Sequence, residues 1–329
     1  MVGMALPPLA LTMGDPAGIG IEIAVKAWHA RKKTNLSAFC LIGTATEIQR
    51  QADSLSGDIP VRRITRIGDA DALFNDAIPV LDIQNNDNPA AATLTAIETA
   101  VELCLARKAS GLVTNPIQKK RLYDAGFKHP GHTEFLAELT KSEGPAVMML
   151  ACSELKVVPA TIHVALEEVP SALSEEHLEH VIRCVDKDLQ ERFSIDKPRI
   201  VVAGLNPHAG ENGSMGQEEK NMISPLVYKL AAEGLSVSGP FPADSLFHKA
   251  ARQKYDAAIC MYHDQALIPI KTIDFDRGVN VTLGLPIIRT SPDHGTADDI
   301  AGKGLANPAS LIAALQMAAQ MAAYSRHVS

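Results

Sequence analysis

Residues 200–211 read IVVAGLNPHAGE, and the pattern in this stretch points to the fold of the whole chain. Its first part is a short apolar run of β-branched residues, which is typical of a buried β-strand. Its second part turns polar at Asn206 and introduces Pro207, His208 and Gly210. A buried strand that ends in a polar, glycine-containing segment is the arrangement found in parallel α/β sheets, where ligands bind beyond the carboxyl ends of the strands.

The same succession recurs along the chain. Apolar runs alternate with segments of helical periodicity, which predicts crossover connections and a mostly parallel sheet with helices on both faces. The predicted strands are 9–12, 38–42, 111–114, 146–150, 157–161, 200–204 and 257–261, and the predicted helices are 92–106, 133–139, 175–191, 218–233 and 310–323. No internal repeat or low-complexity linker is visible, so we expect any domain boundary to be a cleft within a compact body.

Composition narrows the class of protein. A chain of 329 residues is long enough for one large domain or two ordinary ones. The formal net charge of −7 provides no basic field for nucleic acid or anionic lipid, so an anionic ligand must be bound by a few converging cations. The first 13 residues lack a basic region and no apolar stretch reaches membrane-spanning length, which predicts a cytoplasmic protein without a membrane span. The five scattered cysteines include no CxxC pair.

Three histidines follow three of the predicted strands. His163 follows the run 157–161, His208 follows 200–204 and His263 follows 257–261. Parallel strands end at one edge of a sheet, so these side chains can converge there. Three neutral imidazoles suit Zn²⁺ or a related borderline ion and leave one position open for a substrate. The alternative is that each histidine caps its strand by hydrogen bonding.

The sequence also contains candidate anion-binding residues. Residues 131–134, Gly-His-Thr-Glu, open a helical segment, where free N–H groups attract a phosphate or carboxylate. Ordinary N-capping by Thr133 is the alternative. Lys271, Asn280 and Arg289 punctuate or border the apolar stretch 268–288. The two cations either pair with nearby aspartates or hold an anionic substrate, which Arg289 can do bidentately.

A glycine-rich loop, GDPAGIG at 14–20, links the first strand to a helix that begins near Ile21. Its G-x-x-x-G-x-G spacing is not the dinucleotide fingerprint, and no P-loop lysine follows. The loop is therefore compatible with a nucleotide site and equally with a tight strand-to-helix connection.

Taken together, the motifs resemble the PdxA family of 4-hydroxythreonine-4-phosphate dehydrogenases. They are TMGDPAGIG at 12–20, PGHTEF at 130–135, GLNPHAGE at 204–211, MYHDQ at 261–265, GVNVTLGLP at 278–286 and RTSPDHGTA at 289–297. The resemblance runs from about residue 11 to residue 318. It implies an α/β fold like that of isocitrate and isopropylmalate dehydrogenases, with two α/β/α subdomains, mostly parallel sheets and an interdomain cleft. We expect a cofactor-side domain at 1–130 with 285–329, and a metal, substrate and dimerisation domain at 131–284.

The resemblance also implies an activity and its site. The family oxidises 4-phosphooxy-L-threonine at C3 with NAD or NADP, and decarboxylation gives 3-amino-2-oxopropyl phosphate for pyridoxal 5′-phosphate (vitamin B6) biosynthesis. It is homodimeric, with an active site shared between subunits and one divalent metal per subunit, zinc, magnesium or cobalt. By this resemblance the metal ligands are His163, His208 and His263, and the substrate-binding residues are His132, Thr133, Lys271, Asn280 and Arg289.

The stretch 293–308 is similar to the cofactor-binding segment of isocitrate and isopropylmalate dehydrogenases. That likeness implies that the adenosine half of the cofactor contacts His294, Gly295, Thr296, Ala297, Asp299 and Asn307. No general base is identified, although Asp244 is a weak candidate that could equally cap a helix. Two other functions compete: a dehydrogenase of 4-phospho-threonate or 4-phospho-erythronate, and a non-catalytic phosphate- or metal-binding protein.

Overall fold

The structure is a computed structural model that describes residues 6–56, 59–83, 88–124, 126–129 and 131–325. Contacts between residues divide the chain into two compact units. The first unit comprises the described residues up to Ala146 and those from Leu285 onward, and the second comprises Val147–Gly284. The second unit is therefore an insertion within the sequence of the first.

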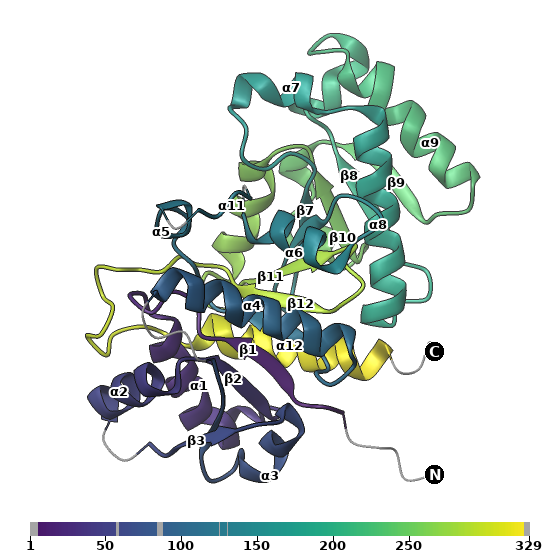
Figure 1. The fold of residues 1–329 in the computed structure, drawn as a ribbon. Helices are drawn as coiled ribbons and strands as arrows, with labels where there is room; N and C mark the ends of the chain where they lie inside the picture. The colour runs from purple at the N-terminus through teal and green to yellow at the C-terminus, as the bar shows by residue number, and fades with distance from the viewer. Residues whose placement is uncertain (1–5, 57–58, 84–87, 125, 130, 326–329) are drawn as a thin grey trace, which may run out of the picture. The chain divides into compact units, whose positions relative to one another are not determined.

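The first unit contains a fully parallel sheet with the strand order β3-β4-β2-β1-β5-β12 (Figure 1). The inner strands β2, β1 and β5 are buried along their whole length, whereas the edge strand β3 buries only its two ends, as expected where one side is solvated. The strands are β1 (Leu9–Thr12), β2 (Phe39–Gly43), β3 (Val61–Ile64), β4 (Ile78–Asp82), β5 (Leu112–Thr114) and β12 (Arg289–Pro292).

Helices of the first unit pack along this sheet. α4 contacts β1, β2 and β5, while α12 contacts β12, β5 and β1 and also packs against α1. These helices present buried alanine-rich faces that allow close approach to the strands. The helices are α1 (Gly20–Thr34), α2 (Ala45–Ser56), η1 (Ile67–Asp69), α3 (Ala70–Leu73), α4 (Pro89–Leu105), α5 (Lys119–Asp124), α6 (His132–Thr140) and α12 (Ala309–Ser325).

The second unit has a mixed sheet in the order β11-β6-β7-β10-β8-β9. β6 runs antiparallel to both β11 and β7, and the remaining pairs are parallel. Its strands are β6 (Val147–Ala151), β7 (Lys156–Pro159), β8 (Ile200–Ala203), β9 (Val237–Phe241), β10 (Ala257–Cys260) and β11 (Val279–Leu283). Its helices are η2 (Leu166–Glu168), α7 (Val169–Ala172), α8 (Glu175–Phe193), η3 (Pro207–Gly213), η4 (Glu219–Ile223), α9 (Ser224–Ala232), η5 (Ala243–Ser245), α10 (Lys249–Arg252) and α11 (His263–Ile273).

The predicted fold class, α/β with mostly parallel sheets, is confirmed. Each predicted strand and helix is present with its bounds shifted by a few residues at most, although the helix predicted at 218–233 is divided into η4, a π-helix, and α9. α6 packs on α4 and lies in the first compact unit.

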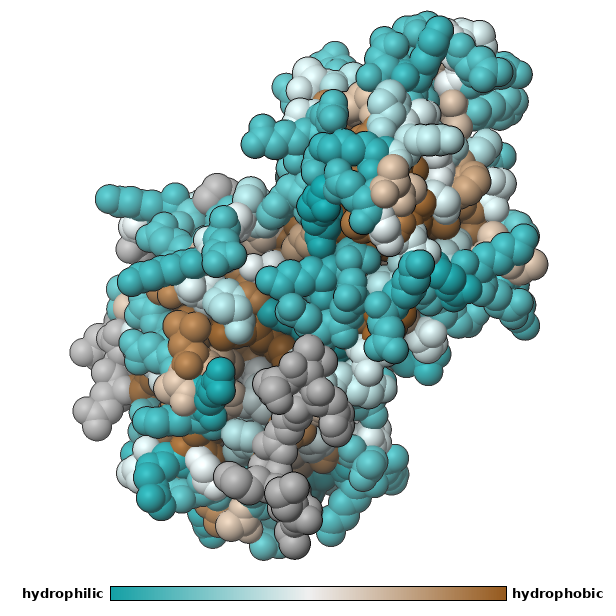
Figure 2. Space-filling view, turned by 90° about the vertical axis from the view of Figure 1, so that its right-hand side faces the viewer, coloured by the Kyte–Doolittle hydropathy of each residue, from teal (hydrophilic) through white to brown (hydrophobic). Residues whose placement is uncertain are grey.

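None of the described helices is long and apolar enough to cross a bilayer. Polar and charged residues cover much of the face shown in Figure 2, with apolar residues in separate patches. Buried apolar side chains from β6, β7, β8 and β10 form a core cluster with Ala266 and Ile270 of α11, which fixes that helix on the sheet of the second unit.

The start of α1 depends on the absence of a side chain at Gly20. A Cβ at this position would lie 2.5 Å from the Met13 carbonyl oxygen and 3.1 Å from the Asn115 Cβ. Because the closest atom belongs to the backbone, it cannot rotate away. The glycine loop can therefore fold back on β1 and β5 only with glycine at residue 20.

We expect Gly20→Ala to lower the free energy of unfolding by about 1–3 kcal/mol, the usual cost of forcing extra volume into a packed site. Chemical denaturation would measure the loss. Gly68→Ala is the matched control, because a Cβ at that exposed glycine meets no atom within 4 Å. Equal stability of the two variants would contradict this account of the loop.

Candidate active site

The carboxyl ends of β7, β10 and β8 lie side by side, because Pro159 pairs with Cys260 and Ile259 pairs with Val202. His163 lies in the loop after β7, and His263 is the first residue of α11 after β10. Their ring centroids are 6.0 Å apart. The parallel pairing therefore brings two of the three predicted metal ligands together within the second unit.

His263 is oriented by its neighbour in sequence. Its Nδ1 is 2.6 Å from Asp264 Oδ1, and a carboxylate acceptor there makes Nδ1 the donor. The Nε2 lone pair is then available to a metal ion, in the carboxylate–imidazole arrangement common at metal sites. His263 is 37% exposed and His163 is exposed, so both rings are accessible to solvent.

His208 lies in η3, a left-handed turn. Six consecutive residues, 208–213, have φ between 41° and 95°, and four of them are not glycine. Such a conformation costs about 1–2 kcal/mol for each L-residue, so the surrounding structure must hold it in place. The Glu219 carboxylate contributes: it is buried, accepts hydrogen bonds from the Asn206 backbone N–H and side chain, and packs against Gly210.

The three histidines do not form a complete set in the single chain. Within the described ranges, no group of three His, Cys, Asp or Glu side chains is close enough to hold a metal ion. His163 and His263 thus fit two ligand positions of one ion, and His208 is presented separately on η3. Asp244, the weak candidate for a general base, is exposed in η5.

The first unit contains three of the predicted substrate-binding residues. Arg289 begins β12, is 3% exposed and donates from Nε and Nη2 to Thr114 Oγ1, at 3.2 and 2.6 Å. Burial lowers the pKa of Arg289 to about 10, so the guanidinium stays charged at neutral pH. His132 and Thr133 open α6, whose N-cap residue Gly131 provides no side-chain hydrogen bond. The N–H groups of the first turn are therefore available to an anion.

His132 is held in its neutral form. Burial, the positive charge of Arg289 and that of Lys119, in this order of size, lower its pKa well below the usual value. Its Nε2 is buried without a hydrogen-bond partner among the described residues. A neutral imidazole with one unsatisfied ring nitrogen, beside two cations, is suited to contact an anionic ligand.

Lys271 and Asn280 belong to the second unit. Asn280 lies in the middle of β11 opposite Leu150, and its Oδ1 is buried with no donor within the described part of the chain. A buried unsatisfied acceptor is costly unless a ligand or water supplies a donor. Lys271 lies in the last turn of α11, with its Nζ 5.4 Å from the centre of the Phe275 ring.

The predicted cofactor stretch packs against the glycine loop within the first unit. The Ile19 N–H donates to the Thr296 carbonyl over 3.0 Å, and a Cβ at Gly18 would lie only 2.9 Å from the Thr296 Cβ. Within the same stretch, Asn307 Oδ1 accepts a hydrogen bond from the Ala309 N–H at the start of α12, and His294 Nδ1 lies 3.0 Å from the Gly295 carbonyl oxygen. Ala297 has a φ of 44°, and Asp299 is exposed.

Arg121 joins the two segments, and the sequence pattern did not reveal it. Its Nη1 donates to Asp15 Oδ2 over 2.9 Å and its Nη2 to Asp298 Oδ2 over 2.5 Å. Asp15 is buried and also caps the Ala17 N–H, so the guanidinium bridges the glycine loop and the cofactor stretch. The partners are 106 and 177 residues from Arg121 in sequence, which is why no local motif indicates them.

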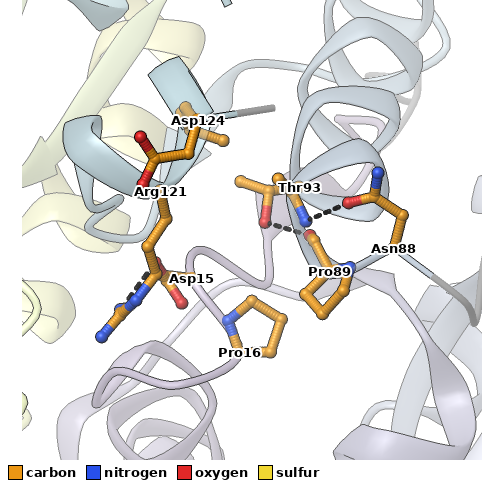
Figure 3. A pocket seen from close by; sticks show the side chains of 9 residues that line it. Asp15, Pro16, Asn88, Pro89, Thr93, Arg121 and Asp124 are labelled. Carbon is orange, nitrogen blue, oxygen red and sulfur yellow. Dashed lines mark hydrogen bonds and ion pairs between the residues drawn. The ribbon is translucent and has the colours of Figure 1, made fainter. Parts of the chain in front are cut away.

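A pocket of about 390 Å³ lies beside this bridge (Figure 3). Arg121 and Asp124 of α5 line one side, Asn88, Pro89 and Thr93 line the other, and residues 15–16 lie between them. Asn88 caps the Ala90 and Ala91 N–H groups, and Thr93 donates its hydroxyl to Gly14 and Pro89 carbonyls. The walls are thus fixed by internal hydrogen bonds, and the pocket adjoins the glycine loop.

The structure is that of an α/β protein with a candidate anion site beside Arg289 and His132 in one unit and two neighbouring imidazoles at strand ends in the other. The family model of the pyridoxal phosphate biosynthetic protein PdxA matches residues 35–318, so the chain belongs to this family. A 4-hydroxythreonine-4-phosphate dehydrogenase of Bradyrhizobium diazoefficiens is 51% identical, over 98% of this chain and 99% of that protein.

Solved structures agree with this assignment. The crystal structure of 4-hydroxythreonine-4-phosphate dehydrogenase from Klebsiella pneumoniae is 36% identical, with a TM-score of 0.87 over 96% of this chain and 99% of that one. A terephthalate 1,2-cis-dihydrodiol dehydrogenase from Burkholderia xenovorans is 27% identical, with a TM-score of 0.65 over 95% and 98% of the two chains.

The lowered pKa of His132 makes stability depend on pH. The unfolded chain binds a proton at this histidine below about pH 6.5, whereas the folded chain resists protonation there, so stability falls as the pH drops below that value. We expect His132→Asn to reduce the decline in melting temperature between pH 7 and pH 5. The control is His29→Asn at an exposed histidine, and an unchanged pH profile for His132→Asn would contradict the lowered pKa.

Proposed function

We propose that this chain oxidises the C3 hydroxyl of 4-phosphooxy-L-threonine with a nicotinamide cofactor, and that decarboxylation then yields 3-amino-2-oxopropyl phosphate for pyridoxal 5′-phosphate synthesis. The observation that carries the proposal is the near full-length identity of about 50% to relatives that bear the name 4-hydroxythreonine-4-phosphate dehydrogenase. A non-catalytic binding protein is not favoured, because the relatives are named as enzymes over the same length.

The reaction sets requirements that the residues of the chain can meet. A hydride leaves C3 for the nicotinamide and the hydroxyl proton is lost; then the C1–C2 bond breaks, CO2 leaves and C2 takes up a proton. The substrate must be held by its anionic ends while this occurs, because orientation supplies much of the rate. We assign its phosphate to the N-terminus of α6 with His132, Thr133 and Arg289, and we assign further polar contacts to Lys271 and Asn280.

The metal is assigned to His163, His208 and His263. Imidazole nitrogens suit zinc, cobalt and, less well, magnesium, and two of the three rings already adjoin. When bound, a divalent ion supplies a Lewis acid that stabilises negative charge on the substrate oxygen. Asp264 orients His263 for this role, and Glu219 holds the turn that presents His208. We propose that the enzyme acts in the cytoplasm as a homodimer in which the partner subunit completes the ligand set.

The adenosine half of NAD or NADP is assigned to the stretch that includes His294, Gly295, Thr296, Ala297, Asp299 and Asn307. Support comes from the way this stretch is anchored. Lys26 donates to the Gly304 and Ala306 carbonyls, and the buried Glu22 carboxylate accepts from both Lys26 and the Ala306 N–H. Arg121 fixes its other end through Asp298. These contacts fix the backbone of the stretch, which supports the assignment because a fixed backbone loses less conformational freedom when a ligand binds.

The metal assignment is tested with His208→Ala. We expect this variant to lose most of its bound divalent metal, measured by atomic emission after dialysis, and to form NADH from 4-phosphooxy-L-threonine at least about a hundredfold more slowly. His248→Ala, an exposed histidine of the same unit, is the control. Full activity of His208→Ala without bound metal would refute the assignment.

The substrate assignment is tested by comparing kcat/KM for 4-phosphooxy-L-threonine with that for 4-phospho-D-erythronate or 4-phospho-threonate. We expect the amino acid to be preferred by at least about tenfold, since the amino group adds a specific contact. A preference for either acid that lacks the amino group would contradict the assignment and would indicate a dehydrogenase of sugar-acid catabolism.

The cofactor assignment is tested with Arg121→Gln. Loss of the bridge frees the cofactor stretch from the glycine loop, so we expect the Kd for NAD⁺ to rise by about tenfold with metal content unchanged. Arg66→Gln is the matched control, since Arg66 forms an exposed ion pair with Asp69 in the same unit. The Arg66 pair is exposed and should contribute little stability, whereas Asp15, a partner of Arg121, is buried, so thermal denaturation must first show that Arg121→Gln is folded. Equal NAD⁺ affinity of the two folded variants would exclude the assignment.

A further inference from the structure

Lys119 lies at the N-terminal end of α6, although it belongs to α5. A Cβ placed on Gly131, the N-cap residue of α6, would be 3.3 Å from Lys119 Nζ and 3.5 Å from its Cε. The end of the lysine side chain is therefore beside the first turn that contains His132 and Thr133. Both segments belong to the first unit.

The ammonium group has no hydrogen-bond or ion-pair partner among the residues that the structure describes. Glu134 Oε2 would be 3.1 Å from the same Cβ position, and no ion pair joins it to Lys119 within the described ranges. Lys119 is exposed, so its charge costs little in the absence of a ligand.

Lys119 nonetheless acts on the site. Its charge and that of the buried Arg289 both lower the pKa of His132, so each cation lies within electrostatic range of this imidazole. The first turn of α6 adds N–H groups that no side chain caps. The His132 imidazole, with its unsatisfied buried nitrogen, thus lies at the start of α6 and within reach of the charges of two cations.

We propose that Lys119 is a further substrate-binding residue, which contacts the phosphate group together with His132, Thr133 and Arg289. This inference rests on the proposed function. A phosphate monoester is a dianion at neutral pH, and the single charge of Arg289 balances half of it. Arg289 offers a rigid, buried fork, whereas Lys119 reaches in from α5 as a mobile point charge.

The proposal makes Lys119 different from its neighbour Lys120. Both are exposed lysines in the first turn of α5, but only Lys119 approaches Gly131 and affects the pKa of His132. Lys120→Ala is therefore a control that removes the same charge from nearly the same place. Any general effect of net charge or of α5 stability appears in both variants.

The experiment measures KM and kcat for 4-phosphooxy-L-threonine, and the competitive inhibition constant of inorganic phosphate, in the metal-loaded full chain. For Lys119→Ala we expect both KM and the inhibition constant to rise about tenfold, with kcat within about twofold, because a contact to the unreacting phosphate is made equally in the ground and transition states. Lys119→Arg should recover most of the affinity, and Lys120→Ala should match the wild type.

A second measurement separates this inference from the proposed reaction. Phosphate-induced stabilisation against heat requires no turnover, and it should be weaker in Lys119→Ala than in Lys120→Ala. If the wild type does not oxidise 4-phosphooxy-L-threonine but this difference is observed, the proposed reaction fails and the role of Lys119 in binding phosphate stands. If turnover occurs and the two variants show the same KM and the same inhibition by phosphate, the inference is wrong.

Discussion

Parallel pairing of β7, β10 and β8 is the constraint on which the candidate metal site depends. The pairing requires that all three strands end at one edge and that each continue into a loop or helix start at that edge. His163 and His263 lie near each other because their strands are neighbours, and not because of any local preference of the loops. The backbone hydrogen bonds of the buried sheet thus position His163 and His263, which are 100 residues apart in the sequence.

Burial also determines the charge states of the candidate substrate-binding residues in the first unit. Burial of Arg289 lowers its pKa to about 10, yet a guanidinium with this pKa remains protonated, so the site keeps a permanent charge. The same burial makes His132 neutral. Burial therefore leaves Arg289 charged and His132 neutral, so that a cation and an uncharged hydrogen-bonding group lie in the same region. Lys119 adds a charge that stays in water until a ligand arrives.

The sequence predicted the structural features that depend on a local pattern of residues. It did not predict those that depend on contacts between residues far apart in the sequence. The strand runs and helix periods indicated the parallel α/β class, and the polar residues after them indicated where His163 and His263 would lie. The left-handed turn at 208–213 was not predictable, because the glycines and asparagine there permit it but Glu219 and the packing around it hold it. Arg121 was missed for the same reason: its two carboxylate partners lie far along the chain. Lys119 stands next to Lys120 in the sequence, and no local pattern distinguishes the two.

The position of β12 has a consequence for synthesis of the protein. β12 pairs with β5, but the entire second unit is made between them. During translation this edge of β5 therefore lacks β12 until residues 289–292 have been synthesised, after the whole of the second unit. Synthesis of the first unit therefore begins before that of the second unit and ends after it. An unpaired strand edge is open to wrong pairing, so protection of β5 depends on the late synthesis of β12.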